Sequence, residues 1–393
     1  MTNPAVKSKR TRRAIIIGGS LSGLFSGALL REIGWQVDIY ERSKSDLDSR
    51  GGGVVLQPDV LRVFNRTKAN GTLTNRGVQS RHRRVFRPDG RIESKQIAPQ
   101  MQTSWSLIYA TMKDVFGDGS YHQGKTLVDI TQDDDARTVT AVFSDGTEET
   151  GDLLIGADGN GSTVRTLLWP EAQPTYAGYL AWRGLVDENK MPDVAREGLH
   201  GDFAFANNRH SHILGYLVPG TDQNTNDGHR LYNWVWYRTA DAEQLRSIMT
   251  DRNGKYRGYA MPEGLLGDEW KATVYKDADR LLPAPFREIV KATEQPFGQA
   301  IRDLTVKSMV KGRVVLIGDA AFIPRPHTAA STSKAASNAL DLADALKSKP
   351  DNIDAALADW QPAQLDLGNM LYSQGTRAGD YLLFKTAPAS KVG

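Results

Sequence analysis

The chain has 393 residues, of which 40% are hydrophobic and 24% are charged, as is typical of a globular protein and not of a disordered one. The formal net charge of +3 is too small to predict nucleic-acid binding. Because the chain contains no cysteine, disulfides, thiolate-bound metals and a cysteine nucleophile are excluded. No metal site is predicted, and the lack of cysteine favours a reducing, cytoplasmic location.

Neither a membrane helix nor a signal peptide is predicted. No run approaches the roughly 20 apolar residues that a membrane helix needs. The basic cluster at residues 7–13 is followed by only a few apolar residues before two glycines. We interpret this cluster as a solvated tail that precedes the first strand.

A strand, a tight turn, a helix and a second strand are predicted in succession at the start of the chain. Residues 14–17 are apolar and β-branched, as in a buried strand, and the next six read Gly18-Gly19-Ser20-Leu21-Ser22-Gly23. Apolar residues then recur at helical spacing up to Gly34, and residues 35–40 alternate as a strand before Glu41. A glycine-rich turn that follows a strand and opens a helix is the arrangement that a dinucleotide-binding fingerprint requires.

The turn at 18–23 is suited to a pyrophosphate, because a helix N-terminus presents free N–H groups and a partial positive charge. Gly18 permits the tight turn and Gly23 permits close packing of helix on strand, whereas Ser20 replaces the usual middle glycine. Glu41 stands where a carboxylate accepts hydrogen bonds from ribose hydroxyls. The alternative is an ordinary glycine turn of a doubly wound sheet, with Glu41 as a surface charge.

Shorter elements are predicted between residues 51 and 155. A glycine-rich loop at 51–53 precedes a short strand at 54–56 and a helix at 59–64. The polar, arginine-rich stretch 65–102 is interpreted as surface loops with short strands. The pattern then predicts a helix at 107–116, a β-meander over 127–150 and a buried strand at 153–155.

Two further buried strands each end in a turn that contains an aspartate. Gly156-Ala157-Asp158-Gly159 follows the strand at 153–155, and Gly318-Asp319-Ala320 follows the strand at 313–317. A carboxylate at the end of a buried strand can accept hydrogen bonds from cofactor hydroxyls, and Arg165 can hold a phosphate nearby. The alternative for each is a well-capped turn. Singly these turns are ordinary, but three of them in this order are specific.

The residue pattern changes in the middle of the chain. Alternating, aromatic-rich segments at 175–300 predict an antiparallel sheet. We therefore predict a mixed α/β fold in which an antiparallel β-sheet substrate domain, residues 175–300, is inserted into a Rossmann-like domain. Residues 1–174 form the first part of that domain, with substrate-side segments near 65–105. Residues 301–393 complete it and add C-terminal helices, including one at 333–346. Aromatic residues such as Trp182, Trp234 and Trp236 are predicted to be core rather than pocket wall.

The three turns together resemble those of the single-component FAD-dependent aromatic hydroxylases, the para-hydroxybenzoate hydroxylase-like group. The resemblance spans about 14–375 and is strongest to the bacterial 2,6-dihydroxypyridine 3-hydroxylase type. It rests on Val-Val-Leu-Gln-Pro at 54–58, Thr-Tyr-Ala-Gly-Tyr at 175–179, Trp182-Arg183-Gly184 and Arg325-Pro326-His327. It implies FAD as cofactor, NADH or NADPH as co-substrate, dioxygen and a small aromatic substrate as reactants, and a homodimer.

The implied reaction is hydroxylation of a hydroxylated aromatic or N-heteroaromatic ring through a flavin C4a-hydroperoxide. The cofactor-binding positions that the resemblance implies are Gly18, Ser20, Leu21, Ser22, Glu41, Arg42, Val54, Gln57, Tyr109, Val128, Asp158, Asp319, Ala329 and Ala330. The sequence departs from the group in two places. Tyr109 replaces an arginine, and Ala329-Ala330-Ser331-Thr332 replaces a Gly-Gly-Gln-Gly-like stretch.

Ring activation by loss of a hydroxyl proton favours a general base with a pKa near the working pH, as histidine has. By resemblance, His327 lies at the flavin face. His212 and Tyr216 are four apart on one predicted strand, hence on one face, and by resemblance border the substrate cavity. The alternative for each is a structural hydrogen-bonding role. For the whole protein, two alternatives are another flavin-dependent oxidation, such as halogenation or epoxidation, and a non-catalytic flavin-binding regulator.

Overall fold

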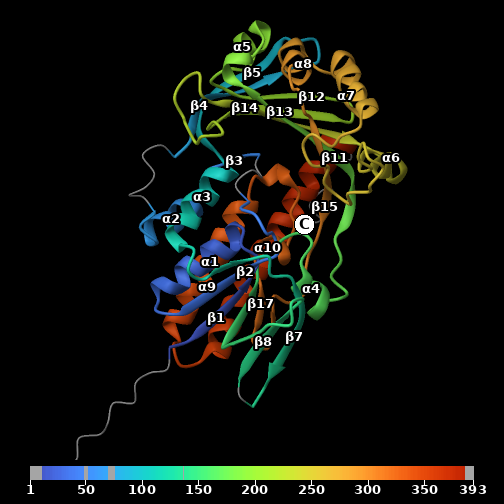
Figure 1. Ribbon diagram of the computed structural model, residues 1–393. Coiled ribbons are helices and arrows are strands. Elements are labelled where there is room, and N and C mark those ends of the chain that lie inside the picture. Colours follow the sequence, from blue (N-terminus) through green and yellow to red (C-terminus); the bar gives the residue numbers. More distant parts are fainter. Residues whose placement is uncertain (1–10, 48–51, 70–75, 136, 386–393) are drawn as a thin grey trace, which may run out of the picture.

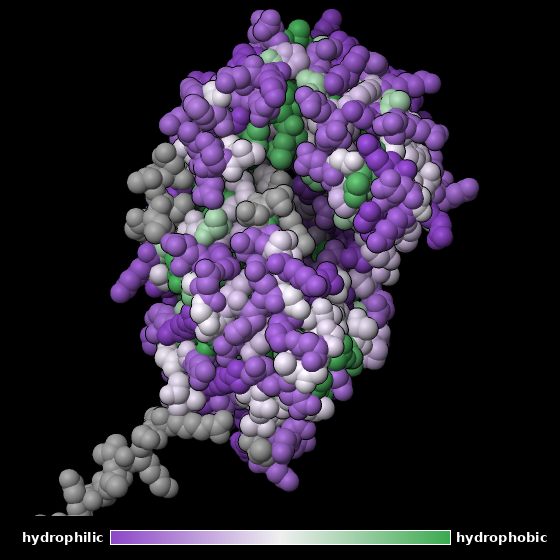
Figure 2. Space-filling model, viewed as in Figure 1, coloured by the Kyte–Doolittle hydropathy of each residue, from purple (hydrophilic) through white to green (hydrophobic). Residues whose placement is uncertain are grey.

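The computed structural model describes residues 11–47, 52–69, 76–135 and 137–385 (Figure 1). Most of the basic tail at 7–13, and Gly51, therefore lie outside the described residues. The chain forms two lobes, with a parallel sheet and its helices in the lower lobe of Figure 1 and a large second sheet in the upper lobe. The face shown in Figure 2 is mostly hydrophilic and is hollowed between the lobes.

The lower lobe has a six-stranded sheet in the order β16-β17-β10-β1-β2-β6, parallel except for β16 at one edge. Its strands are β1 (Arg13–Ile17), β2 (Gln36–Glu41), β6 (Tyr121–Gln123), β10 (Leu153–Gly156), β16 (Val310–Lys311) and β17 (Val314–Leu316). The apolar runs that predicted β1, β10 and β17 are fully buried, because layers cover both faces of the sheet.

Helices cover one face of this sheet, and a smaller sheet packs on the other. The helices of this lobe are α1 (Leu21–Glu32), α2 (Pro58–Arg66), α3 (Trp105–Phe116), α4 (Thr163–Leu168), α9 (Ser331–Ser348) and α10 (Ile353–Gly379). The smaller sheet is the predicted meander, with strands β7 (Leu127–Asp133), β8 (Thr138–Phe143) and β9 (Glu148–Gly151). Short helical turns follow the last strand and helix: η3 (Gly318–Ala320), η4 (Pro326–Thr328) and η5 (Asp380–Phe384).

The upper lobe is built on an eight-stranded sheet in the order β15-β11-β14-β13-β12-β4-β5-β3. Its strands are β3 (Gly53–Val55), β4 (Val78–Phe86), β5 (Ile92–Ser104), β11 (Thr175–Asp187), β12 (Phe203–Asn208), β13 (Ser211–Val218), β14 (Leu231–Thr239) and β15 (Phe297–Asp303). The sheet therefore joins strands from the first third of the chain to strands from its middle.

One sequence-based expectation for this lobe was wrong. The stretch 65–102 contains the long strands β4 and β5, not loops with short strands. Only the last three residues of β5 are buried, so the apolar alternation that identifies a strand is missing. The middle of the chain also adds helices to its strands: η2 (Glu188–Lys190), α5 (Asp193–Leu199), α6 (Ala242–Ile248), α7 (Asp268–Leu281) and α8 (Ala284–Lys291).

The two faces of the large sheet have different partners. One face carries Trp182, Trp234 and Trp236, which are buried in one cluster with side chains of α5 to α8, so these tryptophans are core as predicted. Because successive side chains of a strand point to opposite faces of the sheet, the opposite face carries Tyr179, His212, Tyr216 and Tyr237. There, Tyr179 reaches His327 of the lower lobe, so this face borders the space between the lobes.

Candidate active site

The three predicted turns meet at one edge of the parallel sheet. Strands β1, β10 and β17 are adjacent and parallel, which brings their C-terminal ends together. Gly18 has a φ of +104°, and a Cβ added there would lie 2.5 Å from the carbonyl oxygen of Ala157. A Cβ added at Gly318 would lie 2.2 Å from Oγ of Ser22. The first turn is therefore in contact with both of the others.

Helix α1 opens at this edge with N–H groups available to a ligand. Its N-cap, Ser20, makes no side-chain capping bond in the described part of the chain, and its first turn carries no acidic residue. A Cβ at Gly23 would lie 2.0 Å from the carbonyl oxygen of Gly18, so only glycine permits this close packing. An uncapped N-terminus behind a glycine turn fits the pyrophosphate of a dinucleotide.

Glu41, at the end of β2, is buried beside this turn. Its carboxylate accepts hydrogen bonds from the backbone N–H of Gly19 (2.9 Å) and of Ser43 (2.8 Å). Each carboxylate oxygen has a second acceptor position, which leaves capacity for ribose hydroxyls. Arg42 is exposed next to it. Val128 is also exposed, at a register shift between β7 and β8.

Asp158 and Arg165 hold the second turn together. The Asp158 carboxylate accepts bonds from Oγ of Ser162 (2.5 Å) and from the N–H groups of Thr163 (2.6 Å) and Val164 (3.1 Å). The guanidinium of Arg165 is buried and donates to three backbone carbonyls. Arg165 therefore stabilises this turn, as the alternative of a well-capped turn predicts, and its contact with a phosphate stays a prediction.

The third turn contains an ion pair that the sequence did not predict. Nζ of Lys334 lies 2.9 Å from a carboxylate oxygen of Asp319 and also donates to the carbonyl of Phe322. The Lys334 side chain is 1% exposed and that of Asp319 is 38% exposed. The buried lysine holds the carboxylate from the protein interior, while the solvent-facing side of the carboxylate remains open to a ligand. The sequence signal that could have indicated this ion pair is the charge of Lys334 on the otherwise apolar side of helix α9.

The segment after η4 shapes the edge where the flavin-side residues were predicted. Ala329 adopts a left-handed backbone with a φ of +52°, and Ala330 is the N-cap of α9. Like α1, α9 has neither a side-chain cap within the described residues nor an acid in its first turn. Nε2 of Gln57 lies 3.5 Å from the carbonyl oxygen of Ala329. Gln57 follows β3, which contains Val54, so these predicted residues share one region.

Tyr109 acts on the first turn through a second tyrosine. It is buried, stacks on Trp105 at 5.0 Å between ring centroids, and its hydroxyl lies 3.3 Å from that of Tyr121. Tyr121 donates a hydrogen bond to the carbonyl oxygen of Gly19 at 2.9 Å. Tyr121 was not singled out from the sequence, because an aromatic residue in a short strand carries no local sign of this contact.

The predicted histidines come together across the lobes. Nε2 of His327 lies 2.9 Å from the Tyr179 hydroxyl, and its ring centroid is 5.9 Å from that of His212. The Tyr237 ring completes a triangle with them, 4.7 Å from His327 and 5.9 Å from His212. Tyr216 is on the same face, but its ring packs on Phe203 at 4.7 Å. Tyr179 and Tyr237 were not predicted as site residues.

Burial sets the protonation states of this cluster. It lowers the pKa of His212 to about 4 and that of His327 to about 3, so both imidazoles are neutral near pH 7. Burial also raises the pKa of Tyr237 to about 12, so this phenol keeps its proton. Nδ1 of His212 lies 2.5 Å from Oδ1 of Asn207, which can only accept. Nδ1 therefore carries the hydrogen, and Nε2 carries the lone pair that can take a proton.

A dinucleotide-binding lobe beside a sheet that carries a buried histidine and several tyrosines is the arrangement expected of an FAD-binding oxidoreductase, and comparison with known proteins agrees. A family model described as FAD binding domain-like matches residues 176–303. The 2,6-dihydroxypyridine 3-monooxygenase of Paenarthrobacter nicotinovorans is 34% identical over 363 residues, 92% of this chain and 89% of that protein.

Solved structures show the same relationship. The 2,6-dihydroxypyridine-3-hydroxylase from Arthrobacter nicotinovorans has a TM-score of 0.90 and 31% identity, covering 98% of this chain and 96% of that one. Klebsiella pneumoniae HpxO, solved with FAD and uric acid, shares the fold with a TM-score of 0.75 at 22% identity, covering 95% of this chain and 89% of that one.

The chain belongs to the family of FAD-dependent aromatic monooxygenases. The predicted family, fold class and enzyme class are confirmed, as is FAD with NAD(P)H as the co-substrate typical of the family. The glycine cradle, the uncapped α1 and the open side of Asp319 fit this cofactor. In the part of the chain that the structure describes, no helix is long and apolar enough to cross a membrane.

Proposed function

We propose that the protein uses NAD(P)H and dioxygen to hydroxylate a hydroxypyridine-like ring, an N-heteroaromatic that already carries a hydroxyl group. The observation that carries the proposal is the pair of neutral histidines that face each other across the lobes, His212 on the large sheet and His327 in the cofactor lobe, with ring centroids 5.9 Å apart. A relative that shares 34% identity is named for action on 2,6-dihydroxypyridine, which supports this ring class.

Each lobe has its own task in this proposal. The first turn, Glu41 and Asp319 hold FAD, with Gln57, Ala329 and Ala330 toward its ring system. When bound, FAD supplies the redox chemistry by which dioxygen delivers one oxygen atom to the ring. The sheet of the upper lobe binds the ring and excludes water from it.

Activation of the ring falls to His212. Its Nε2 accepts the proton of a ring hydroxyl, which makes the ring more electron-rich where oxygen is added. The phenols of Tyr216 and Tyr237 stay protonated and can donate hydrogen bonds to the resulting oxide. His327, held by Tyr179, orients the ring from the cofactor side. The lowered pKa of His212 keeps its imidazole unprotonated throughout the neutral range but also makes it a weaker base, so the proton transfer depends on the hydrogen bonds that stabilise the resulting oxide.

The decisive experiment follows NAD(P)H oxidation by the holoenzyme in air with hydroxypyridines, hydroxynicotinates and phenols. One ring is expected to stimulate oxidation strongly and to gain one atom of ¹⁸O from ¹⁸O₂. Matched methoxy analogues, which lack the ionisable hydroxyl, should give no hydroxylated product. Stimulation without ¹⁸O in the product, or no response to any ring by a flavin-loaded protein, contradicts the proposal.

We also propose a cytoplasmic homodimer. The absence of cysteine supports the reducing compartment, and the family resemblance supports the dimer. Light scattering on the purified holoenzyme tests the second point, since one 43.3 kDa chain and two differ twofold in mass.

A further inference from the structure

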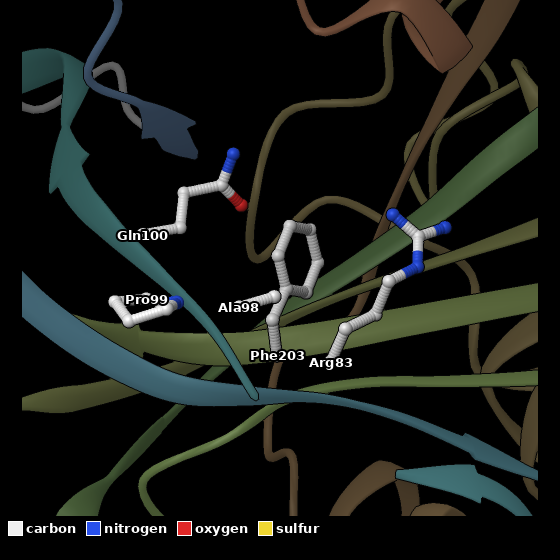
Figure 3. Close-up of a pocket in the computed structure, with 5 residues that line it drawn as sticks. All are labelled: Arg83, Ala98, Pro99, Gln100 and Phe203. Atoms are coloured by element: carbon white, nitrogen blue, oxygen red, sulfur yellow. The ribbon is translucent and has the colours of Figure 1, made fainter. Parts of the chain in front are cut away.

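A hollow opens on the large sheet where β4, β5 and β12 lie side by side. It is lined by Arg83, Ala98, Pro99, Gln100 and Phe203 (Figure 3). In Figure 3 the ring of Phe203 stands between Gln100 and the guanidinium of Arg83. The hollow therefore combines an aromatic wall with a cationic group and an amide.

Ring contacts connect this hollow to the histidine cluster. Arg83 and Phe203 are register partners on β4 and β12. The Phe203 ring lies 4.7 Å from Tyr216 and 4.5 Å from Phe205, and Phe205 lies 6.1 Å from His212. The hollow and the proposed base are therefore parts of one continuous aromatic surface.

Arg83 brings a positive charge to this surface without a carboxylate partner. Its strand neighbours His82 and Arg84 both pair with Asp202. Across the described ranges no ion pair includes Arg83, whose Cζ lies 4.2 Å from the ring centroid of Phe205. Burial is the main cause of the low pKa of His212, and the charge of Arg83 adds to it. The field of Arg83 therefore reaches the proposed base.

We propose that Arg83 is a specificity-determining residue that binds an anionic oxygen group of the aromatic substrate, a carboxylate or a ring oxide. This inference rests on the proposed function and deepens it by naming the charge of the substrate. The planar guanidinium matches such oxygens with two parallel N–H donors, and Phe203 offers a face for the ring. The positive charge of Arg83, which reaches His212 across the Phe205 ring, also stabilises the ring oxide after His212 has taken its proton.

The test measures binding without turnover. The oxidised holoenzyme, without NAD(P)H, is titrated with 6-hydroxynicotinate, its amide 6-hydroxynicotinamide, and 2,6-dihydroxypyridine, while the flavin absorbance is followed. The protein is used as wild type, Arg83→Gln, Arg83→Lys and Arg91→Gln. Arg91→Gln is the matched control, since it removes the same charge from an exposed arginine paired with Asp89.

For a carboxylate ligand, Arg83→Gln should raise the Kd of 6-hydroxynicotinate roughly tenfold or more and that of its amide far less. For a ring oxide, the loss should instead appear with 2,6-dihydroxypyridine and should diminish as the pH falls and the ring is protonated. Arg83→Lys should recover part of the affinity, and Arg91→Gln should bind like the wild type.

Two outcomes overturn the proposal: equal Kd values for Arg83→Gln and wild type with every probe, or no binding of either anion by the wild type. Product analysis separates this result from the proposed function. If the wild type hydroxylates a ring and Arg83→Gln does so with an unchanged KM, only the role of Arg83 is wrong. If no ring is hydroxylated, the proposed function is wrong, and the titration still reports on the anion site.

Discussion

The hydroxyl group of Tyr179 and Nε2 of His327 lie 2.9 Å apart, and this contact joins the large sheet to the segment after the parallel sheet. Burial raises the pKa of Tyr179, so the phenol keeps its proton and can donate it to the imidazole. Such a bond fixes the tautomer of His327 with the hydrogen on Nδ1. Tyr179 is therefore a positioning residue for His327.

Tyr179→Phe should lower kcat by roughly tenfold, because the freed imidazole loses its orientation, while bound FAD stays at the wild-type level. The lost hydrogen bond should cost about 1 kcal/mol of unfolding free energy. Tyr176→Phe is the matched control, since its hydroxyl donates to the carbonyl of Ala240 at 2.9 Å and its ring packs against the hydrophobic cluster that contains the tryptophans. Equal loss of kcat in both variants would show that only stability was changed.

The free energy of unfolding should decrease as the pH is lowered, because the folded protein lowers the pKa values of two histidines. The folded pKa values of His212 and His327, about 4 and 3, lie below the unfolded value near 6.5. The unfolded state therefore binds more protons below pH 6.5, and the free energy of unfolding decreases as the pH falls toward 4. Each group contributes up to about 1.4 kcal/mol per pH unit in this window.

Urea unfolding of wild type and of His212→Gln across pH 7 to 4.5 checks this prediction. The variant should have a shallower pH slope, whatever its stability at pH 7. His229→Gln is the comparison, because His229 lies in the loop before β14, outside the cluster. A pH slope in His212→Gln as steep as in the wild type would refute the assignment.

Asp319→Ala should deplete bound FAD and also destabilise the protein. The change removes a proposed cofactor contact and leaves the buried ammonium of Lys334 without its carboxylate. The expected loss of unfolding free energy is roughly 2 kcal/mol, since water still reaches one side of this pair. The flavin-to-protein absorbance ratio and urea unfolding measure the two effects separately.

The double variant Asp319→Ala/Lys334→Met removes both charges and serves as the control for Asp319→Ala. It should regain stability while still lacking FAD. Full flavin occupancy in either variant would remove Asp319 from the cofactor site.

Gly23→Ala should impair cofactor binding far more than Gly161→Ala. The new methyl group at residue 23 would lie 2.0 Å from the carbonyl oxygen of Gly18, which forces the first turn to shift. At Gly161 nothing lies within 4 Å of an added Cβ. Flavin retention on a desalting column measures the difference. Similar retention by both variants would contradict the role assigned to the first turn.

The cofactor edge could be predicted from sequence because its signals are local. Each turn directly follows a buried strand, and parallel strands place such turns at a common edge, as Gly18, Asp158 and Asp319 show. The shared face of His212 and Tyr216 followed from the two-residue period of a strand. These inferences needed no knowledge of long-range contacts.

Other features of the site depend on contacts between distant residues. Tyr179 and His327 are 148 positions apart, and neither local pattern indicates the other. The burial of Lys334 against Asp319 likewise depends on residues 15 positions apart, and the sequence carries no direct sign of the pair. Arg83 lies on a long polar strand in a stretch that was interpreted as surface loops with short strands, so the hollow beside it could not be foreseen.

The interleaving of the two lobes along the chain has a consequence for biosynthesis. Strand β17 pairs with β10 through Val314 and Leu154, after the β-rich segment between them has left the ribosome. Asp319 and Lys334 emerge later still. A nascent chain that has released only its N-terminal fingerprint therefore lacks a complete cradle for FAD. We therefore expect flavin capture to require almost the whole chain and to be a late event in the maturation of this enzyme.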